Sequence, residues 1–210
     1  MDAMHAKSSA LKSPAQLCRD LCIFNESDFR PQQICQLPDE HVNFTTMKQA
    51  GVFFVNLQAS GISAAELTRR GFDSARCYRE LGMDALDLTD GFWARNLVAE
   101  LGAEALRAEF ARTPEEAAIL AGSEGAEAIG FTLDAALELC AGQPDAAAAV
   151  LRAQPEPAAA LGSTSLERLL STGLRAIALG ELGLGIEQLR AIWDLDPSHL
   201  RALGFRTGVV

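Results

Sequence analysis

The stretch that decides the fold is residues 51–102, which read GVFFVNLQASGISAAELTRRGFDSARCYRELGMDALDLTDGFWARNLVAELG. A glycine recurs in it every 9 to 11 residues, at Gly51, Gly61, Gly71, Gly82, Gly91 and Gly102. An apolar residue directly follows each of the first five glycines, and another stands six positions after each of them. These two columns are Val52, Ile62, Phe72, Met83 and Phe92, and Leu57, Leu67, Cys77, Leu88 and Leu97. The spacing indicates an internal repeat of about ten residues.

The residue types in these columns describe a short helix with its own start and stop. Glycine is the preferred residue for ending a helix, because it adopts the left-handed conformation without strain. Two residues after several unit starts stands a good N-cap, at Ser63, Asp73, Asp84, Thr164 and Asp196. The apolar residue before the cap would pack against the fourth helical residue as a hydrophobic staple. Helices of six or seven residues are unstable alone, so we expect them to stack on their neighbours.

The same spacing returns near the C-terminus, at Gly162, Gly173, Gly183, Asp194 and Gly204. Ser63 with Glu66, and Thr164 with Glu167, have the spacing of capping boxes. Between the two repeat stretches, residues 113–160 are rich in alanine and the columns blur. Helices are still expected there, from Thr113 to about Gly122, from Thr132 or Asp134 to about Gly142, and over 145–153. Residues 154–162 could form a hinge or further helices of the same stack.

We therefore predict an all-α protein, an α-solenoid-like array of stacked short helices in Gly-punctuated units of about 10–11 residues. The array would cover residues 51–206, with 113–160 as its degenerate middle. It would follow a flexible tail at 1–14 and an N-terminal helical cap at 15–50. The alternative is an irregular α-helical domain that happens to be rich in glycine.

The composition of the 210-residue chain, 49% apolar and 22% charged, is typical of a folded globular protein. A net charge of −10 disfavours nonspecific electrostatic binding to nucleic acid and favours a basic protein partner. No apolar run approaches the roughly 18 residues that a membrane span needs, and the first residues lack the layout of a secretory signal. With five irregularly spaced cysteines, these features predict an intracellular protein whose thiols are free in a reducing compartment.

Three of those cysteines and a histidine form a candidate metal site. Cys18, Cys22, Cys35 and His41 have the spacing Cys-x3-Cys-x12-Cys-x5-His. Cysteine and histidine side chains are the usual ligands of structural zinc, and Cys18 and Cys22 would share one face of a helix. The alternative is that all three cysteines are buried free thiols, which behave as small apolar residues. The second interpretation is the one we adopt, and no metal or cofactor is predicted.

Residues 179–192, LGELGLGIEQLRAI, resemble a helix-hairpin-helix motif. In that family a hairpin reading apolar-Gly-apolar-Gly, here Leu182–Gly185, precedes a helix, and backbone N–H groups hold a nucleic-acid phosphate. The resemblance implies phosphate binding at Gly183 and Gly185, with Arg190 nearby. The proline usual before the first glycine is missing here, and Glu187 brings negative charge to the place where a phosphate would approach.

The chain is also similar to proteins built from short α-helical repeats punctuated by leucine and glycine. Leu101-Gly102 and Leu203-Gly204-Phe205 resemble the Leu-Gly turns of sterile-alpha-motif and mitochondrial-termination-factor repeats. No functional residue follows from these shorter resemblances.

The sequence contains no catalytic motif that we can identify. A Gly-x-Ser-x-Gly elbow, a phosphate-binding loop and His-Glu-x-x-His are all absent from it. No carboxylate pair can be singled out as an acid/base couple. We therefore expect a non-catalytic protein-interaction or structural scaffold, a subunit of a larger assembly. The alternative is a nucleic-acid-associated protein that uses the hairpin near Gly183.

Overall fold

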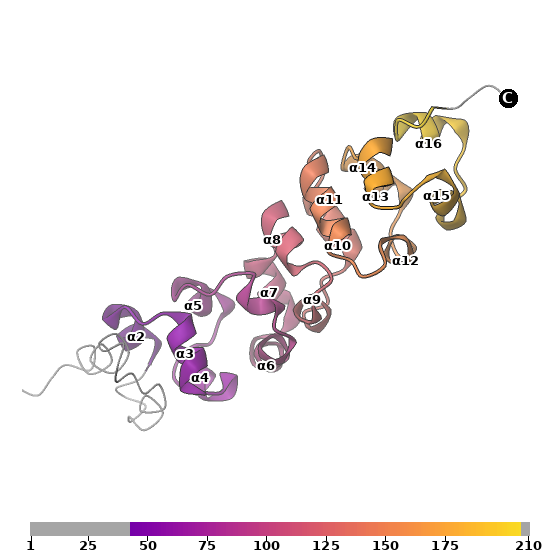
Figure 1. Ribbon diagram of the computed structural model, residues 1–210. Coiled ribbons are helices and arrows are strands. Elements are labelled where there is room, and N and C mark those ends of the chain that lie inside the picture. The colour runs from indigo at the N-terminus through magenta and orange to yellow at the C-terminus, as the bar shows by residue number, and fades with distance from the viewer. Residues whose placement is uncertain (1–42, 207–210) are drawn as a thin grey trace, which may run out of the picture. The chain divides into compact units, whose positions relative to one another are not determined.

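The computed structural model describes residues 43–206 of the chain. Within that range the regular structure is helical, with fifteen α-helices, one 3-10 helix and no strand (Figure 1). The all-α class is thereby confirmed. The chain divides into two compact units, one ending at Met83 and the other beginning at Asp84. The predicted tail at 1–14 and residues 15–42 of the predicted cap lie outside the described residues.

The first unit contains four helices of six or seven residues: α2 (Phe44–Ala50), α3 (Phe54–Ser60), α4 (Ala64–Arg69) and α5 (Ala75–Glu80). After each of them a glycine adopts the left-handed conformation, at Gly51, Gly61, Gly71 and Gly82. The apolar residues that follow these glycines are buried, as are Leu57 and Leu67 of the second column. The predicted left-handed glycines and the burial of these apolar residues are confirmed at these positions.

The glycines can recur every ten residues because the same residues of a short helix contribute to both its start and its end. α4 has six residues, and they are followed by the C-cap Arg70, the left-handed Gly71 and the apolar Phe72. The N–H groups of Gly71 and Phe72 donate to the carbonyl oxygens of Thr68 and Leu67, at 3.0 and 3.1 Å, as in a Schellman motif. Leu67 is the fourth residue from the start of α4 and the third from its end. One buried leucine is therefore positioned for both the staple before the helix and the apolar contact after it.

Alternate helices of the first unit are tied by backbone hydrogen bonds. The first N–H of α2, at Phe44, donates to the carbonyl of Arg70 after α4, at 3.1 Å. The first N–H of α3, at Phe54, donates to the carbonyl of Leu81 after α5, at 2.8 Å. Aromatic rings fill the space between these helices, with the Phe44 and Phe72 centroids 5.5 Å apart and edge to face. The core of this unit is therefore built between alternate helices, α2 with α4 and α3 with α5.

The second unit contains the 3-10 helix and the eleven remaining α-helices of the described range. They are η2 (Asp87–Thr89), α6 (Gly91–Leu101), α7 (Ala103–Phe110), α8 (Pro114–Leu120), α9 (Glu124–Ala128), α10 (Leu133–Leu139), α11 (Pro144–Arg152), α12 (Pro157–Leu161), α13 (Leu166–Ser171), α14 (Ala176–Glu181), α15 (Ile186–Ile192) and α16 (Pro197–Ala202). The three helices expected between 113 and 153 are present as α8, α10 and α11. The stretch left open between a hinge and further helices holds α12, while α9 was not expected.

In the second unit a series of contacts joins helices that are three apart in chain order, and the series advances by two helices at a time. α6 contacts α9, α8 contacts α11, α10 contacts α13 and α12 contacts α15. The N–H of Ala176, the first residue of α14, donates to the carbonyl of Leu203 after α16, at 2.7 Å. Similarly, the Arg107 side chain of α7 donates to the carbonyl of Ile129, the C-cap of α9. The turns after α2, α4, α5, α9, α14 and α16 all carry both Schellman hydrogen bonds.

The prediction that Gly91 ends a helix is wrong. Gly91 is buried and begins α6, after the N-cap Asp90. The cap and helix that start here turn the next side chain outward, so Phe92 is 65% exposed instead of buried. A Cβ on Gly91 would lie 2.6 Å from Cβ of Glu124 on α9. This glycine therefore allows two helices to approach closely, which is a different role from closing a turn.

Two helices begin one residue later than predicted. The N-caps of α5 and α13 are Ser74 and Ser165, where Asp73 and Thr164 were expected. The hydroxyl of Thr164 is buried and donates to the carbonyl of Leu161, so the predicted box with Glu167 does not form. Gly162, which precedes α13, has φ −60° and is not left-handed. The backbone after α12 therefore lacks the left-handed glycine that ends most of the other helices.

Asp84 and Asp87 cap one another at the start of the second unit. Asp84 accepts from the N–H groups of Leu86 and Asp87, at 2.8 and 3.1 Å, and its own N–H donates to the Asp87 carboxylate at 3.0 Å. The element that follows is the 3-10 helix η2, where an α-helix was expected. Burial raises the pKa of Asp87, the negative charge of Asp84 adds to the rise, and the backbone hydrogen bond opposes it.

A raised pKa at Asp87 predicts a definite pH dependence. The folded protein binds this proton more tightly than the unfolded chain does, so the stabilisation is fully present below the ordinary carboxyl value of 3.8. It is lost as the pH rises through the raised pKa. We expect a carbon-13 NMR titration of the Asp87 carboxyl to have its midpoint above 3.8. A midpoint at or below that value would contradict the role given to burial.

Candidate functional site

The four candidate metal ligands, Cys18, Cys22, Cys35 and His41, lie outside the described residues, so the metal hypothesis stays a prediction. Across residues 43–206, no group of three or more His, Cys, Asp and Glu side chains is arranged to hold a metal ion. The cysteines of this range, Cys77 and Cys140, are buried free thiols. Burial raises the pKa of the Cys140 thiol, which disfavours the reactive thiolate.

The glycines of the helix-hairpin-helix resemblance lie in the turn between α14 and α15. The N–H of Gly183 donates to the carbonyl of Gly180 at 3.0 Å, and that of Leu184 donates to the carbonyl of Leu179 at 2.8 Å. The same pair of bonds closes the turns after α2, α4, α5, α9 and α16. Gly185 is the N-cap of α15, whose first turn contains Glu187, and Arg190 is exposed further along that helix. Phosphate binding at Gly183, Gly185 and Arg190 stays a prediction, and this geometry adds no support to it.

The nucleic-acid alternative has a direct test at this turn. The described part of the second unit carries nineteen acidic and nine basic residues, and the turn amides of Gly183 and Leu184 are already bonded. We therefore expect micromolar protein at low salt to leave duplex DNA and RNA unshifted in gel electrophoresis. A shift that is abolished by Arg190→Ala, but not by the control Arg201→Ala on α16, would instead establish the phosphate site.

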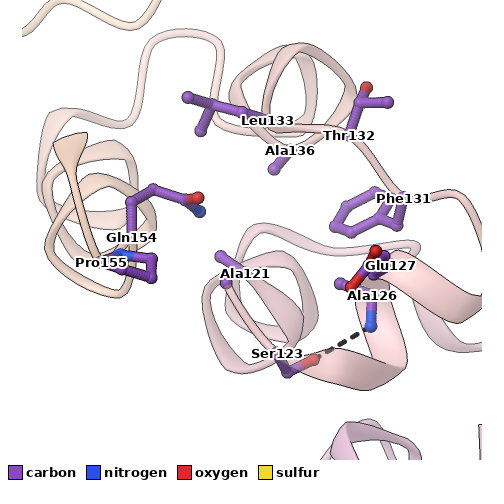
Figure 2. A pocket seen from close by; sticks show the side chains of 11 residues that line it. Ala121, Ser123, Ala126, Glu127, Phe131, Thr132, Leu133, Ala136, Gln154 and Pro155 are labelled. Carbon is purple, nitrogen blue, oxygen red and sulfur yellow. Dashed lines mark hydrogen bonds between the residues drawn. The ribbon is translucent and has the colours of Figure 1, made fainter. Parts of the chain in front are cut away.

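A groove of about 270 Å³ opens on the second unit, where α8, α9, α10 and the end of α11 meet (Figure 2). Ala121 and Ala136 face each other across it, and the Phe131 ring forms one wall. Ala136 stands six residues after the left-handed Gly130, in the column that is leucine in most other units. Alanine occupies less volume than leucine at this position, which is among those that line the groove.

Backbone packing also shapes the groove. Gly122, in the turn after α8, has φ 72°. A Cβ at this glycine would lie 2.3 Å from the carbonyl oxygen of Ala153, the C-cap of α11. Glycine therefore lets the two helix ends meet, and this close approach brings Gln154 to the rim of the groove.

The polar groups of the groove favour a positively charged occupant. Of the residues that line it, only Glu127 is charged. Its carboxylate lies beside the Phe131 ring, and the Gln154 side chain points in from the opposite side (Figure 2). The hydroxyl oxygens of Ser123 and Thr132 already accept helix-capping hydrogen bonds, at 3.0 and 3.2 Å. The Gln154 amide nitrogen donates to the carbonyl of Val150 at 3.5 Å, so the Gln154 amide oxygen and the Glu127 carboxylate remain as the acceptors best placed to contact a ligand.

Sequence reasoning did not anticipate this groove. The available signal was the order Gly130, Phe131, Thr132, which is the glycine, apolar residue and N-cap of a regular unit. Thr132 is one of the two expected starts of this helix, but Gly130 was not assigned to the glycine spacing, because alanine replaces leucine at position 136 and the surrounding sequence is rich in alanine.

No protein-family model, curated protein or solved structure matches this chain. Among the helices of the described range, none combines the length and the apolar character needed to cross a bilayer.

Proposed function

We propose that this protein is a non-catalytic interaction scaffold, a subunit of a larger assembly that holds a basic protein partner. Its short helices would stack as an α-solenoid-like array in a reducing intracellular compartment, without a cofactor. The strongest support is a backbone hydrogen bond between alternate helices. In it, the first N–H of one helix donates to the carbonyl of the residue that follows the next helix but one. It recurs at Phe44, Phe54 and Ala176, and thus in both units.

The size of the helices makes stacking necessary. Isolated helices shorter than about 12 residues are marginal in water, and every helix of the described range falls below that length. In stacked repeats each element contacts near neighbours, and the outer faces of many repeats form extended binding surfaces. The groove beside Phe131 is slightly smaller than the roughly 300–1,000 Å³ typical of small-molecule pockets. Both features favour the binding of a macromolecule over chemistry on a small substrate.

The charge distribution supports a basic partner. The described part of the second unit has nineteen acidic and nine basic residues, whereas that of the first unit has three acidic and five basic ones. Complementary charge speeds association and selects against acidic partners. The second unit is therefore the part of the chain that we expect to meet the partner.

Native isolation followed by reconstitution tests the scaffold role. We expect one protein to co-purify stoichiometrically with the tagged full chain, and the complex rebuilt from purified components to weaken as salt is added. An affinity that does not fall with salt would contradict the basic partner. Recovery of no stoichiometric protein from native material would contradict the scaffold role itself.

A further inference from the structure

We infer that the groove beside Phe131 binds a lysine or arginine side chain from a basic segment of the partner protein. The inference rests on the proposed scaffold function and specifies the chemistry of one contact. It is carried by the volume of the groove, the nature of its walls and the single negative charge at its edge.

The volume favours one side chain over a free ligand. About 270 Å³ lies just under the range of pockets that enclose small molecules, and the groove is partly open to solvent. A long, unbranched side chain can enter such a groove while the peptide backbone that carries it stays on the surface. The rest of the affinity would come from the acidic surroundings.

The walls match the two parts of a basic side chain. Lysine and arginine lay their methylene stems against apolar surface and keep the charged head at polar groups. Here the Phe131 ring, the Ala121 methyl group and the exposed Pro155 ring supply the apolar surface. The Glu127 carboxylate, beside the Phe131 ring, can accept hydrogen bonds from the head, and the Gln154 amide lies on the opposite side of the groove. A cation near the ring face of Phe131 gains further attraction from the ring electrons.

The helix ends around the groove carry partial charges of both signs. Ala121 is the C-cap of α8, and Gln154 directly follows the C-cap of α11, so partial negative charge lies there. Ser123 and Thr132 are the N-caps of α9 and α10, whose N-terminal ends carry partial positive charge. The preference for a cation therefore comes from the Glu127 carboxylate.

A random peptide display library, selected on the full-length chain, provides the first test. We expect the enriched peptides to share a lysine or arginine and to be lost when Gln154→Trp fills the groove. Circular dichroism of the Gln154→Trp chain verifies that its helices are intact. Enriched peptides without a basic residue, or peptides that the filled variant retains equally, would overturn the inference.

Two sets of variants then separate charge from shape. Fluorescence anisotropy of an enriched peptide should show about tenfold weaker binding to Glu127→Gln, which removes the charge at nearly constant size. The matched control is Glu181→Gln, because Glu181 is also exposed in the last turn of a short helix but lies outside the groove. In the peptide, lysine replaced by norleucine keeps the stem without the charge, and alanine removes both. We expect affinity to fall from lysine to norleucine to alanine.

Equal binding of the lysine and norleucine peptides would overturn the inference, because the groove would then be a simple apolar slot. The same follows if Glu127→Gln and Glu181→Gln have equal effects. In either case a stoichiometric partner that still binds the Gln154→Trp chain leaves the scaffold function standing. Loss of every stoichiometric partner from the wild-type chain would instead remove the proposed function.

Discussion

Replacement of Leu67 by alanine should lower the free energy of unfolding by about 2–5 kcal/mol. The Leu67 side chain is fully buried, and its position in α4 serves both ends of that six-residue helix. The substitution removes apolar contacts and leaves a cavity between short helices that pack against each other. Denaturant unfolding followed by circular dichroism should show a lower midpoint with an unchanged slope.

The matched control is Val55→Ala in α3, an aliphatic side chain that is 61% exposed. It should change stability by less than about 0.5 kcal/mol. Leu97 in α6 of the second unit is as fully buried as Leu67. We expect Leu97→Ala to lower the free energy of unfolding by the same amount, about 2–5 kcal/mol. A loss below about 0.5 kcal/mol at both leucines would show that the second apolar column is not core.

The parts of the fold that could be predicted are those that depend on neighbouring residues alone. Gly183 and Leu184 illustrate this, because a left-handed glycine and the apolar residue after it close a helix through bonds within six residues. The helix expected from Thr113 begins there for the same reason, because Thr113 and Glu116 form a capping box. Such patterns recur wherever the local sequence recurs, so composition and spacing are sufficient to find them.

The parts that could not be predicted depend on segments that are distant in the sequence. Gly91 has the spacing of a turn glycine, yet its role is set by Glu124 on another helix. The groove beside Phe131 needs Gln154, which is brought there by the contact between α8 and α11. Spacing along the chain contains no signal for either approach. The candidate site was therefore missed, although the left-handed Gly130, the apolar Phe131 and the N-cap Thr132 follow the predicted order.

Gly125 in α9 should be the glycine least tolerant of substitution, and Gly125→Ala should destabilise the protein by about 3 kcal/mol, the upper end of the usual cost of overpacking. A Cβ at this position would lie 1.7 Å from the carbonyl oxygen of Leu88 and 3.0 Å from Cα of Thr89. These are backbone atoms, so no side-chain rotation can relieve the contact. The helix α9 and η2 must separate, and the contact between α9 and α6 would loosen with them.

The comparison that isolates this cause is Gly180→Ala in α14. Gly180 is also helical, but an added Cβ meets no atom within 4 Å. Alanine is the better helix former, so Gly180→Ala should stabilise the protein by about 0.5–1 kcal/mol. The two substitutions are chemically identical, but the surroundings of the added Cβ differ. We therefore expect them to shift the unfolding midpoint in opposite directions. A shift of the same sign and size in both variants would mean that backbone preference, not the approach of Leu88, decides the outcome, and the packing of η2 on α9 would have to be revised.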